Sequence, residues 1–221
     1  MITQTYLPIP IAKTKTFQEF FYSLPGAQKA FHLADHCIRC MDEGTPGGKR
    51  RAGSGILDPD IVATLKNHQA EIEGIYAHQG CGAAALASGG IDQSGAEKIS
   101  QIAREAGIPF KGLITEDQLQ RPAHQHIACI LYYTALDFDP SQVEGLPAGF
   151  VLSRDIIDKP EQAIKEGKIA LDIAFHHHIS PFYIVVVAPA KSPAILKQML
   201  DEVEQIKGGN KAIKIDTLIA L

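Results

Sequence analysis

Residues 182–188 form the most apolar segment of the chain and constrain its fold more than any other segment. Their sequence, FYIVVVA, is rich in β-branched and aromatic side chains, which favour strands. A strand with apolar side chains on both faces is typical of the centre of a parallel sheet that helices cover on each side. We therefore expect this strand to be central in an α/β fold.

Other apolar runs alternate with helical signals along the chain. Strands are predicted at 30–39, 73–77, 127–135, 150–152 and 212–219, and helices at 16–22, 58–70, 83–87, 96–106, 161–167 and 192–207. This alternation predicts a mostly parallel central sheet flanked by helices on both faces. We interpret residues 1–221 as a single α/β domain, although this length also leaves room for two small domains. Residues 1–25 are interpreted as an N-terminal arm that packs on its own domain or on a second subunit, and we find no internal sequence repeat.

Composition and charge place the chain among ordinary globular proteins. Hydrophobic residues make up 45% of it, and the formal net charge of −4 gives no reason to expect nucleic acid or an anionic membrane as a partner. No apolar run approaches the roughly 20 residues that span a bilayer, and residues 1–8 lack the basic and apolar regions of a signal peptide. Four cysteines in 221 residues do not form a disulfide framework, so we expect a cytoplasmic protein.

Two short segments combine metal-binding side chains with the end of a predicted strand. Cys40 and Asp42 lie at the end of one such strand, and His78 and Cys81 lie at the end of the next one along the chain. Parallel sheets bind their ligands beyond the carboxyl ends of the strands. We therefore expect the fold to bring Cys40 beside His78 and Cys81.

Two thiolates and one imidazole form a ligand set that zinc prefers, and three protein ligands leave the fourth position of a tetrahedral site open. Such an ion lowers the pKa of a bound water from near 16 to roughly 7, which yields a hydroxide nucleophile at neutral pH. Asp42 either accepts a hydrogen bond from that hydroxide and orients it, or binds the metal itself and closes the site.

These segments resemble the signature of the β-class carbonic anhydrases. The resemblance covers roughly residues 30–90, with a looser similarity in 130–153, and is carried by Cys40-Met41-Asp42, Arg51-Ala52-Gly53 and His78-Gln79-Gly80-Cys81-Gly82-Ala83. By motif position it implies that Zn²⁺ binds to Cys40, His78 and Cys81, and that Asp42 gates or assists the metal-bound water. It further implies a β-carbonic-anhydrase-like fold, hydration of carbon dioxide to bicarbonate by a zinc-bound hydroxide, and a homodimer or a higher oligomer.

The chain departs from the family pattern at a position that bears on activity. In the family an Arg follows the Asp by two residues and holds it off the metal, but Gly44 occupies this position here. Arg50 and Arg51 are the candidates to replace it, because Arg39 lies one residue before the first cysteine ligand and points to the opposite face of its strand. Three functions therefore remain open: hydration of carbon dioxide, hydrolysis of carbonyl sulfide or carbon disulfide, and non-catalytic zinc binding in a site closed by Asp42.

Three further features have no assigned role in this chemistry. The glycine-rich basic segment 44–55 is interpreted either as a ligand-binding loop or as a surface loop. The run His176-His177-His178 predicts an exposed loop or a helix end, where imidazole could shuttle protons. Cys37 and Cys129 lie within apolar runs and are interpreted as core thiols.

Overall fold

The computed structural model describes residues 16–91, 94–119, 129–176 and 181–220. Strands within these ranges are β1 Cys37–Cys40, β2 Lys49–Arg51, β3 Gly74–His78, β4 Phe110–Ile114, β5 Ile130–Thr134, β6 Phe150–Ser153, β7 Phe182–Pro189 and β8 Ile213–Ala220. The α-helices are α1 Phe17–Ser23, α2 Ile61–Asn67, α3 Gly82–Ala87, α4 Ala96–Ala106, α5 Pro160–His176 and α6 Pro193–Lys207. Short 3₁₀ helices are η2 Ala27–Phe31, η3 Ala52–Gly55, η4 Glu116–Gln118, η5 Pro140–Gln142 and η6 Arg154–Ile156. In these ranges, none of the helices combines the length and apolar character that a membrane span requires.

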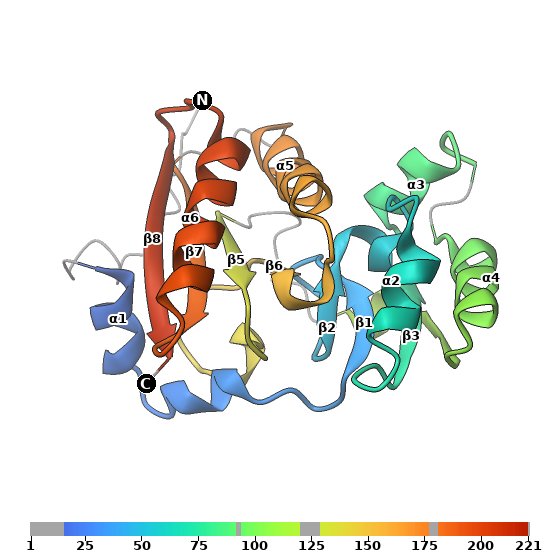
Figure 1. The fold of residues 1–221 in the computed structure, drawn as a ribbon, viewed down its shortest axis with the longest axis horizontal. Coiled ribbons are helices and arrows are strands. Elements are labelled where there is room, and N and C mark those ends of the chain that lie inside the picture. Colours follow the sequence, from blue (N-terminus) through green and yellow to red (C-terminus); the bar gives the residue numbers. More distant parts are fainter. Residues whose placement is uncertain (1–15, 92–93, 120–128, 177–180, 221) are drawn as a thin grey trace.

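All strands pair in parallel, and helices flank them, so the α/β class is confirmed. The expected single central sheet is instead two four-stranded sheets, with strand orders β2-β1-β3-β4 and β6-β5-β7-β8. The sheets meet where β2 and β6 form their facing edges (Figure 1). No ladder joins these edges; instead the Val151 N–H donates to Met41 O at 3.1 Å and the Arg50 N–H donates to Ser153 Oγ at 2.9 Å.

The two sheets repeat one topology. In each, the first strand lies between the second and third strands, and the fourth strand lies outside the third. The connections also correspond, because a 3₁₀ helix and an α-helix follow the second strand, and α-helical segments join the third strand to the fourth. We call residues 37–114 the β1–β4 unit and residues 130–220 the β5–β8 unit. The repeat concerns topology, and it was not found in the sequence because the corresponding side chains differ.

Strand β7 is central, as its sequence predicts, because it pairs with β5 on one side and with β8 on the other. Its side chains alternate between two hydrophobic clusters. Ile184 and Val186 belong to the cluster that includes buried residues of α5 and α6, whereas Val185 and Val187 belong to the cluster that includes the aromatic residues of α1. Both faces of this sheet are therefore covered.

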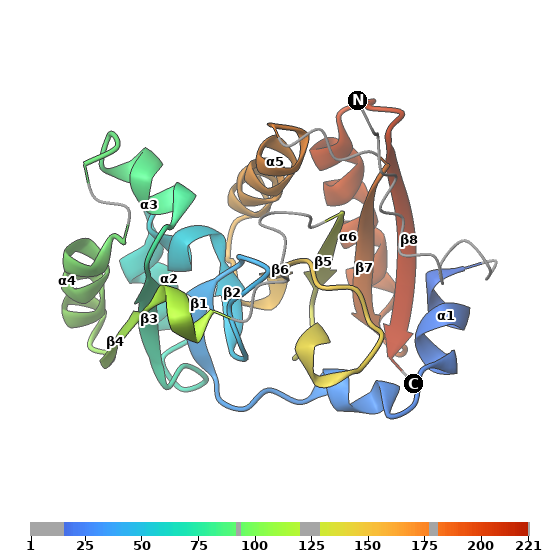
Figure 2. The same cartoon turned by 180° about the vertical axis from the view of Figure 1, so that it is seen from behind.

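The N-terminal helix α1 packs on the β5–β8 unit of the same chain. The Phe17 N–H donates to Asp216 Oδ2 at 2.7 Å, and the Tyr22 hydroxyl donates to Ile219 O at 2.8 Å. Both views place α1 beside β8, at the end of the molecule away from β3 and α4 (Figures 1 and 2). Of the predicted arm, residues 1–15 lie outside the described residues.

Several element boundaries differ from the sequence-based expectations for physical reasons. Segment 44–55 contains β2 and η3 rather than a loop, and β4 was missed because Lys111 and Gly112 interrupt its apolar pattern. Helix α5 continues past Gly167 to His176. This glycine permits close contact with α6, because a Cβ at this residue would lie 2.5 Å from Ile206 Cδ1. Of the histidine run, His176 ends α5, and His177 and His178 lie outside the described residues.

Candidate metal centre

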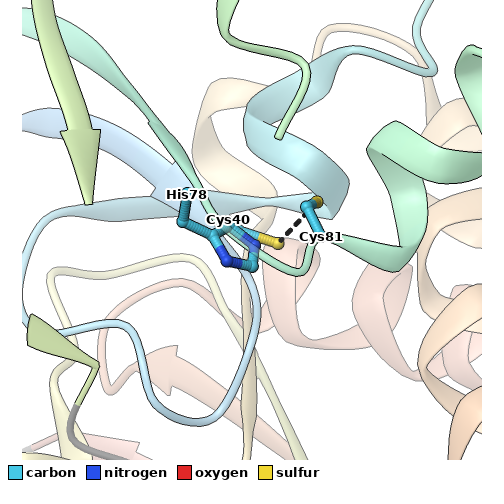
Figure 3. Close-up of side chains that lie close together, drawn as sticks. All are labelled: Cys40, His78 and Cys81. Atoms are coloured by element: carbon cyan, nitrogen blue, oxygen red, sulfur yellow. Dashed lines mark hydrogen bonds between the residues drawn. The ribbon is translucent and has the colours of Figure 1, made fainter. Parts of the chain in front are cut away.

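Cys40, His78 and Cys81 lie together in the β1–β4 unit, as the sequence predicts. Cys40 ends β1, His78 ends the neighbouring strand β3, and Cys81 is the N-cap residue of α3 (Figure 3). Their potential ligand atoms all lie within 4.8 Å of one another, and all three residues are buried. The two Sγ atoms are 3.9 Å apart, which matches the separation of about 3.8 Å that two sulfurs have when each is about 2.3 Å from a tetrahedral zinc ion. The group could therefore hold a metal ion.

His78 has the tautomer and burial of a metal ligand. Its Nδ1 lies 2.8 Å from the carbonyl oxygen of Gln79, so Nδ1 carries the proton and donates it. In the neutral imidazole, the form that binds a metal, the lone pair is therefore on Nε2, a buried atom with no hydrogen-bond partner among the described residues. A buried polar atom without a partner is costly, and a metal ion bound to Nε2 would remove this cost.

Each of the two sulfur atoms accepts a backbone hydrogen bond. The Gly53 N–H donates to Cys40 Sγ at 3.3 Å, and the Ala84 N–H, in the first turn of α3, donates to Cys81 Sγ at 3.4 Å. Gly53 has a left-handed conformation (φ 53°), and a Cβ at this residue would lie 2.8 Å from the Ala83 Cβ. Glycine at this position therefore lets the backbone approach the thiols closely.

The electrostatics of the group favour a thiolate at Cys40. The hydrogen bond from the Cys81 thiol holds the pKa of Cys40 well below its usual value against the opposing effect of burial, and His78 lowers it further. Burial would lower the pKa of His78, but the Cys40 thiolate outweighs this effect and raises it to about 9. The pKa of Cys81 is raised because its thiol is the donor to Cys40. The site thus stabilises a thiolate at Cys40 beside the positive charge of protonated His78. A bound metal cation would replace the proton on His78 and supply that positive charge.

Asp42 lies two residues beyond Cys40 in a turn that Gly44 closes. The Gly44 N–H donates to Asp42 Oδ1 at 3.0 Å. The residue that stands in place of the family's Arg therefore holds the carboxylate through its backbone. Asp42 is close enough to His78 to raise its pKa, but it is not part of the group whose ligand atoms lie within 4.8 Å of one another.

Arg39 and the two candidate arginines, Arg50 and Arg51, bond to carboxylates other than that of Asp42. Arg39 donates to Asp35 at 2.6 and 2.7 Å and stacks on the ring of Tyr76, which agrees with its expected position on the opposite face of β1. Arg50 donates to Asp139 at 3.2 Å, and Arg51 donates to Asp58 at 2.9 Å and to Glu166.

The basic strand β2 is an interface between the two units rather than a ligand-binding loop. Its three side chains are buried, and each contacts a carboxylate of the second part of the chain. Lys49 pairs with Asp137 at 2.7 Å and with Asp155, Arg50 pairs with Asp139, and Arg51 pairs with Glu166. These acidic partners cannot be predicted from the local sequence, because they lie about one hundred residues away from β2 along the chain and follow no local pattern.

The β5–β8 unit has no corresponding ligands. In the strand register, Thr134 of β5 pairs with Ser153 of β6 as Cys40 of β1 pairs with Arg51 of β2. On the third strand of each sheet, Ala188 lies one residue beyond the partner of Thr134, as His78 lies one residue beyond the partner of Cys40. The following α-helix begins after Ser192, as α3 begins after Cys81. The corresponding residues are thus Thr134, Ala188 and Ser192, which offer neither thiol nor imidazole.

Cys37 and Cys129 are buried and lie outside this group, in agreement with their interpretation as core thiols. Burial raises the pKa of both thiols, that of Cys37 to about 11. Neither thiol therefore has the lowered pKa of a reactive cysteine.

Comparison of the chain with known protein families, with curated proteins and with solved structures finds no match. Interpretation of the site therefore depends on its own geometry and on the residue pattern described above.

Proposed function

We propose that this protein is a zinc-dependent lyase of the carbonic anhydrase type, which hydrates carbon dioxide to bicarbonate. The observation that carries the proposal is the buried Nε2 of His78, which no described residue hydrogen-bonds, beside two thiol sulfurs 3.9 Å apart. The β-class resemblance supports it, because the same three residues are the ligands that the resemblance implies. Asp42, whose carboxylate accepts from the Gly44 N–H, occupies the motif position at which the resemblance implies a carboxylate.

When bound, zinc would supply a Lewis acid that lowers the pKa of a coordinated water to roughly 7. Cys40 and Cys81 provide negative charge to hold the cation, and His78 provides a neutral nitrogen. The Asp42 carboxylate, fixed by the Gly44 N–H, orients the attacking water toward the carbon of the substrate. Addition of water to carbon dioxide forms bicarbonate and releases one proton, so the site needs no redox partner.

The proposal is tested by zinc analysis and stopped-flow hydration of carbon dioxide on the same sample. We expect about one zinc per chain and hydration that the Cys81→Ser variant loses together with its zinc. A protein that binds no zinc would refute the proposed metal centre. Bound zinc without hydration would refute the carbonic anhydrase proposal and leave carbonyl sulfide and carbon disulfide as the next substrates to assay.

The Asp42→Ala variant distinguishes an orienting carboxylate from a fourth ligand. Because Asp42 lies outside the group of close ligand atoms, we expect the variant to keep its zinc and to lose about 10²-fold or more in turnover, as removal of a general acid or base usually does. Weaker zinc binding together with increased turnover would instead show that Asp42 closes the site.

A further inference from the structure

Glu166 of α5 is completely buried and contacts the segment that leads to the metal centre from the other unit of the chain. Its carboxylate accepts from the Arg51 guanidinium, from the Ala52 N–H at 2.8 Å and from the Gln162 side chain at 2.9 Å. The contact with Ala52 is a charge-assisted hydrogen bond to the backbone. Glu166 therefore fixes the backbone one residue before Gly53.

The backbone after Ala52 has an unusual conformation. Gly53 and Ser54 are both left-handed, with φ values of 53° and 57°. A non-glycine residue in this conformation costs free energy and persists only where its surroundings hold it. The Ser54 hydroxyl donates to Tyr76 O at 2.6 Å and holds the segment on one side, while Glu166 holds it on the other.

This conformation directs the Gly53 N–H at Cys40 Sγ. We propose that Glu166 is a positioning residue for the metal centre, because it fixes Arg51 and Ala52 so that the Gly53 N–H stays on the Cys40 sulfur. The proposal rests on the metal centre proposed above. In this arrangement the β5–β8 unit has no metal ligands at the corresponding positions, but through Glu166 it holds the backbone that contacts the metal centre of the β1–β4 unit.

Charge balance alone does not account for Glu166. Arg51 already pairs with Asp58 at 2.9 Å, and the hydrogen bond from Ala52 contributes nothing to neutralising the guanidinium. Glu202 provides a matched control, since it is also buried and pairs with Arg154, at 2.9 and 3.0 Å. Arg154 begins the 3₁₀ helix after β6, as Ala52 begins the 3₁₀ helix after β2. The helix that begins at Arg154 is not part of the Cys40, His78 and Cys81 group.

The test compares Glu166→Gln with Glu202→Gln in the full-length protein, using zinc affinity by chelator competition and the thiolate-to-cobalt charge-transfer band of the Co²⁺-substituted protein. A weakened N–H···S bond leaves more electron density on the sulfur. We therefore expect Glu166→Gln to shift the band to lower energy and to weaken zinc binding about tenfold, the lower end of the range for residues behind a metal ligand. Glu202→Gln should lower stability and leave both readouts at their wild-type values.

The outcomes separate the two proposals. If Glu166→Gln keeps the wild-type band and zinc affinity, or changes them no more than Glu202→Gln does, the positioning role is wrong while the metal centre stands. If the wild-type protein binds neither ion, the metal centre is wrong and the role of Glu166 with it. Should Glu166→Gln fail to fold, Glu166→Asp keeps the charge and shortens the reach, and a band unchanged in that variant would overturn the proposal.

Discussion

Asp35 is a single carboxyl whose charge stabilises the start of β1. It accepts from the Arg39 guanidinium at 2.6 and 2.7 Å and from the Cys37 N–H at 2.9 Å. The bond from Arg39 is the main reason that the pKa of Asp35 falls from 3.8 to about 2. Because the folded-state pKa lies below the unfolded-state value, the stabilisation is complete above about pH 4 and is lost as the pH falls toward 2.

We predict that Asp35→Asn lowers the free energy of unfolding by about 1 kcal/mol at neutral pH. The full pKa shift corresponds to roughly 2 kcal/mol, and solvent screening of this partly exposed pair reduces it. Urea denaturation should show the difference from wild type shrinking as the pH falls from 4 toward 2. The exposed residue Glu144 offers a control, and an equal, pH-independent loss in Glu144→Gln would contradict the prediction.

At the residue scale, the ligand group was predictable and its supporting residues were not. Cys40 and His78 are predictable because each lies at the end of a strand that its own sequence predicts, and Cys81 follows His78 by three residues in the turn before a predicted helix. Parallel strands bring such ends together. Glu166 lies on a predicted helix and has no local feature that sets it apart from an exposed glutamate. Its role depends on contacts with residues more than one hundred positions away, which a local pattern cannot reveal.

At the scale of elements, β2 shows where pattern reasoning fails. Its sequence, Lys49-Arg50-Arg51, is fully charged and follows a glycine-rich segment, so it favours an exposed loop. The structure buries all three side chains, at 5%, 1% and 0% exposure, because acidic partners from the β5–β8 unit compensate their charges. Apolar patterns, by contrast, correctly predict α4 and β7, whose buried side chains are apolar.

We predict that trypsin does not cleave the native protein within β2, although this strand offers three consecutive cleavage sites. Proteolysis requires exposed and locally unfolded backbone, whereas β2 is buried and paired with β1. Peptide mapping by mass spectrometry should show early cleavage after Lys191 and Lys211, which are exposed between elements. Early cleavage after Lys49, Arg50 or Arg51 would support the surface-loop interpretation instead.

At the scale of the whole molecule, the two units share one hydrophobic cluster and a set of buried ion pairs. The cluster includes Ile38 and Ile75 of the first sheet together with Leu131 and Val186 of the second. Separation of the units would break the ion pairs at β2 and expose the apolar side chains that both units bury in this cluster. We therefore expect neither unit to unfold without the other. The interpretation of residues 1–221 as a single domain stays a prediction, and cooperative unfolding of the two units would test it.

A destabilising substitution in one unit should therefore lower the stability of both. Leu65 of α2 is completely buried in the β1–β4 unit, and Leu65→Ala should cost about 2–5 kcal/mol. Hydrogen exchange monitored by mass spectrometry reports the opening free energy of each segment. We expect Leu65→Ala to reduce the protection of the slowest amides in β5 and β7 as much as in β1 and β3. Val203→Ala, a substitution in α6 of the β5–β8 unit, should likewise reduce the protection of both units equally. Loss of protection confined to the substituted unit would show that the chain consists of two independent domains, in which the β5–β8 unit could not hold the metal centre in place.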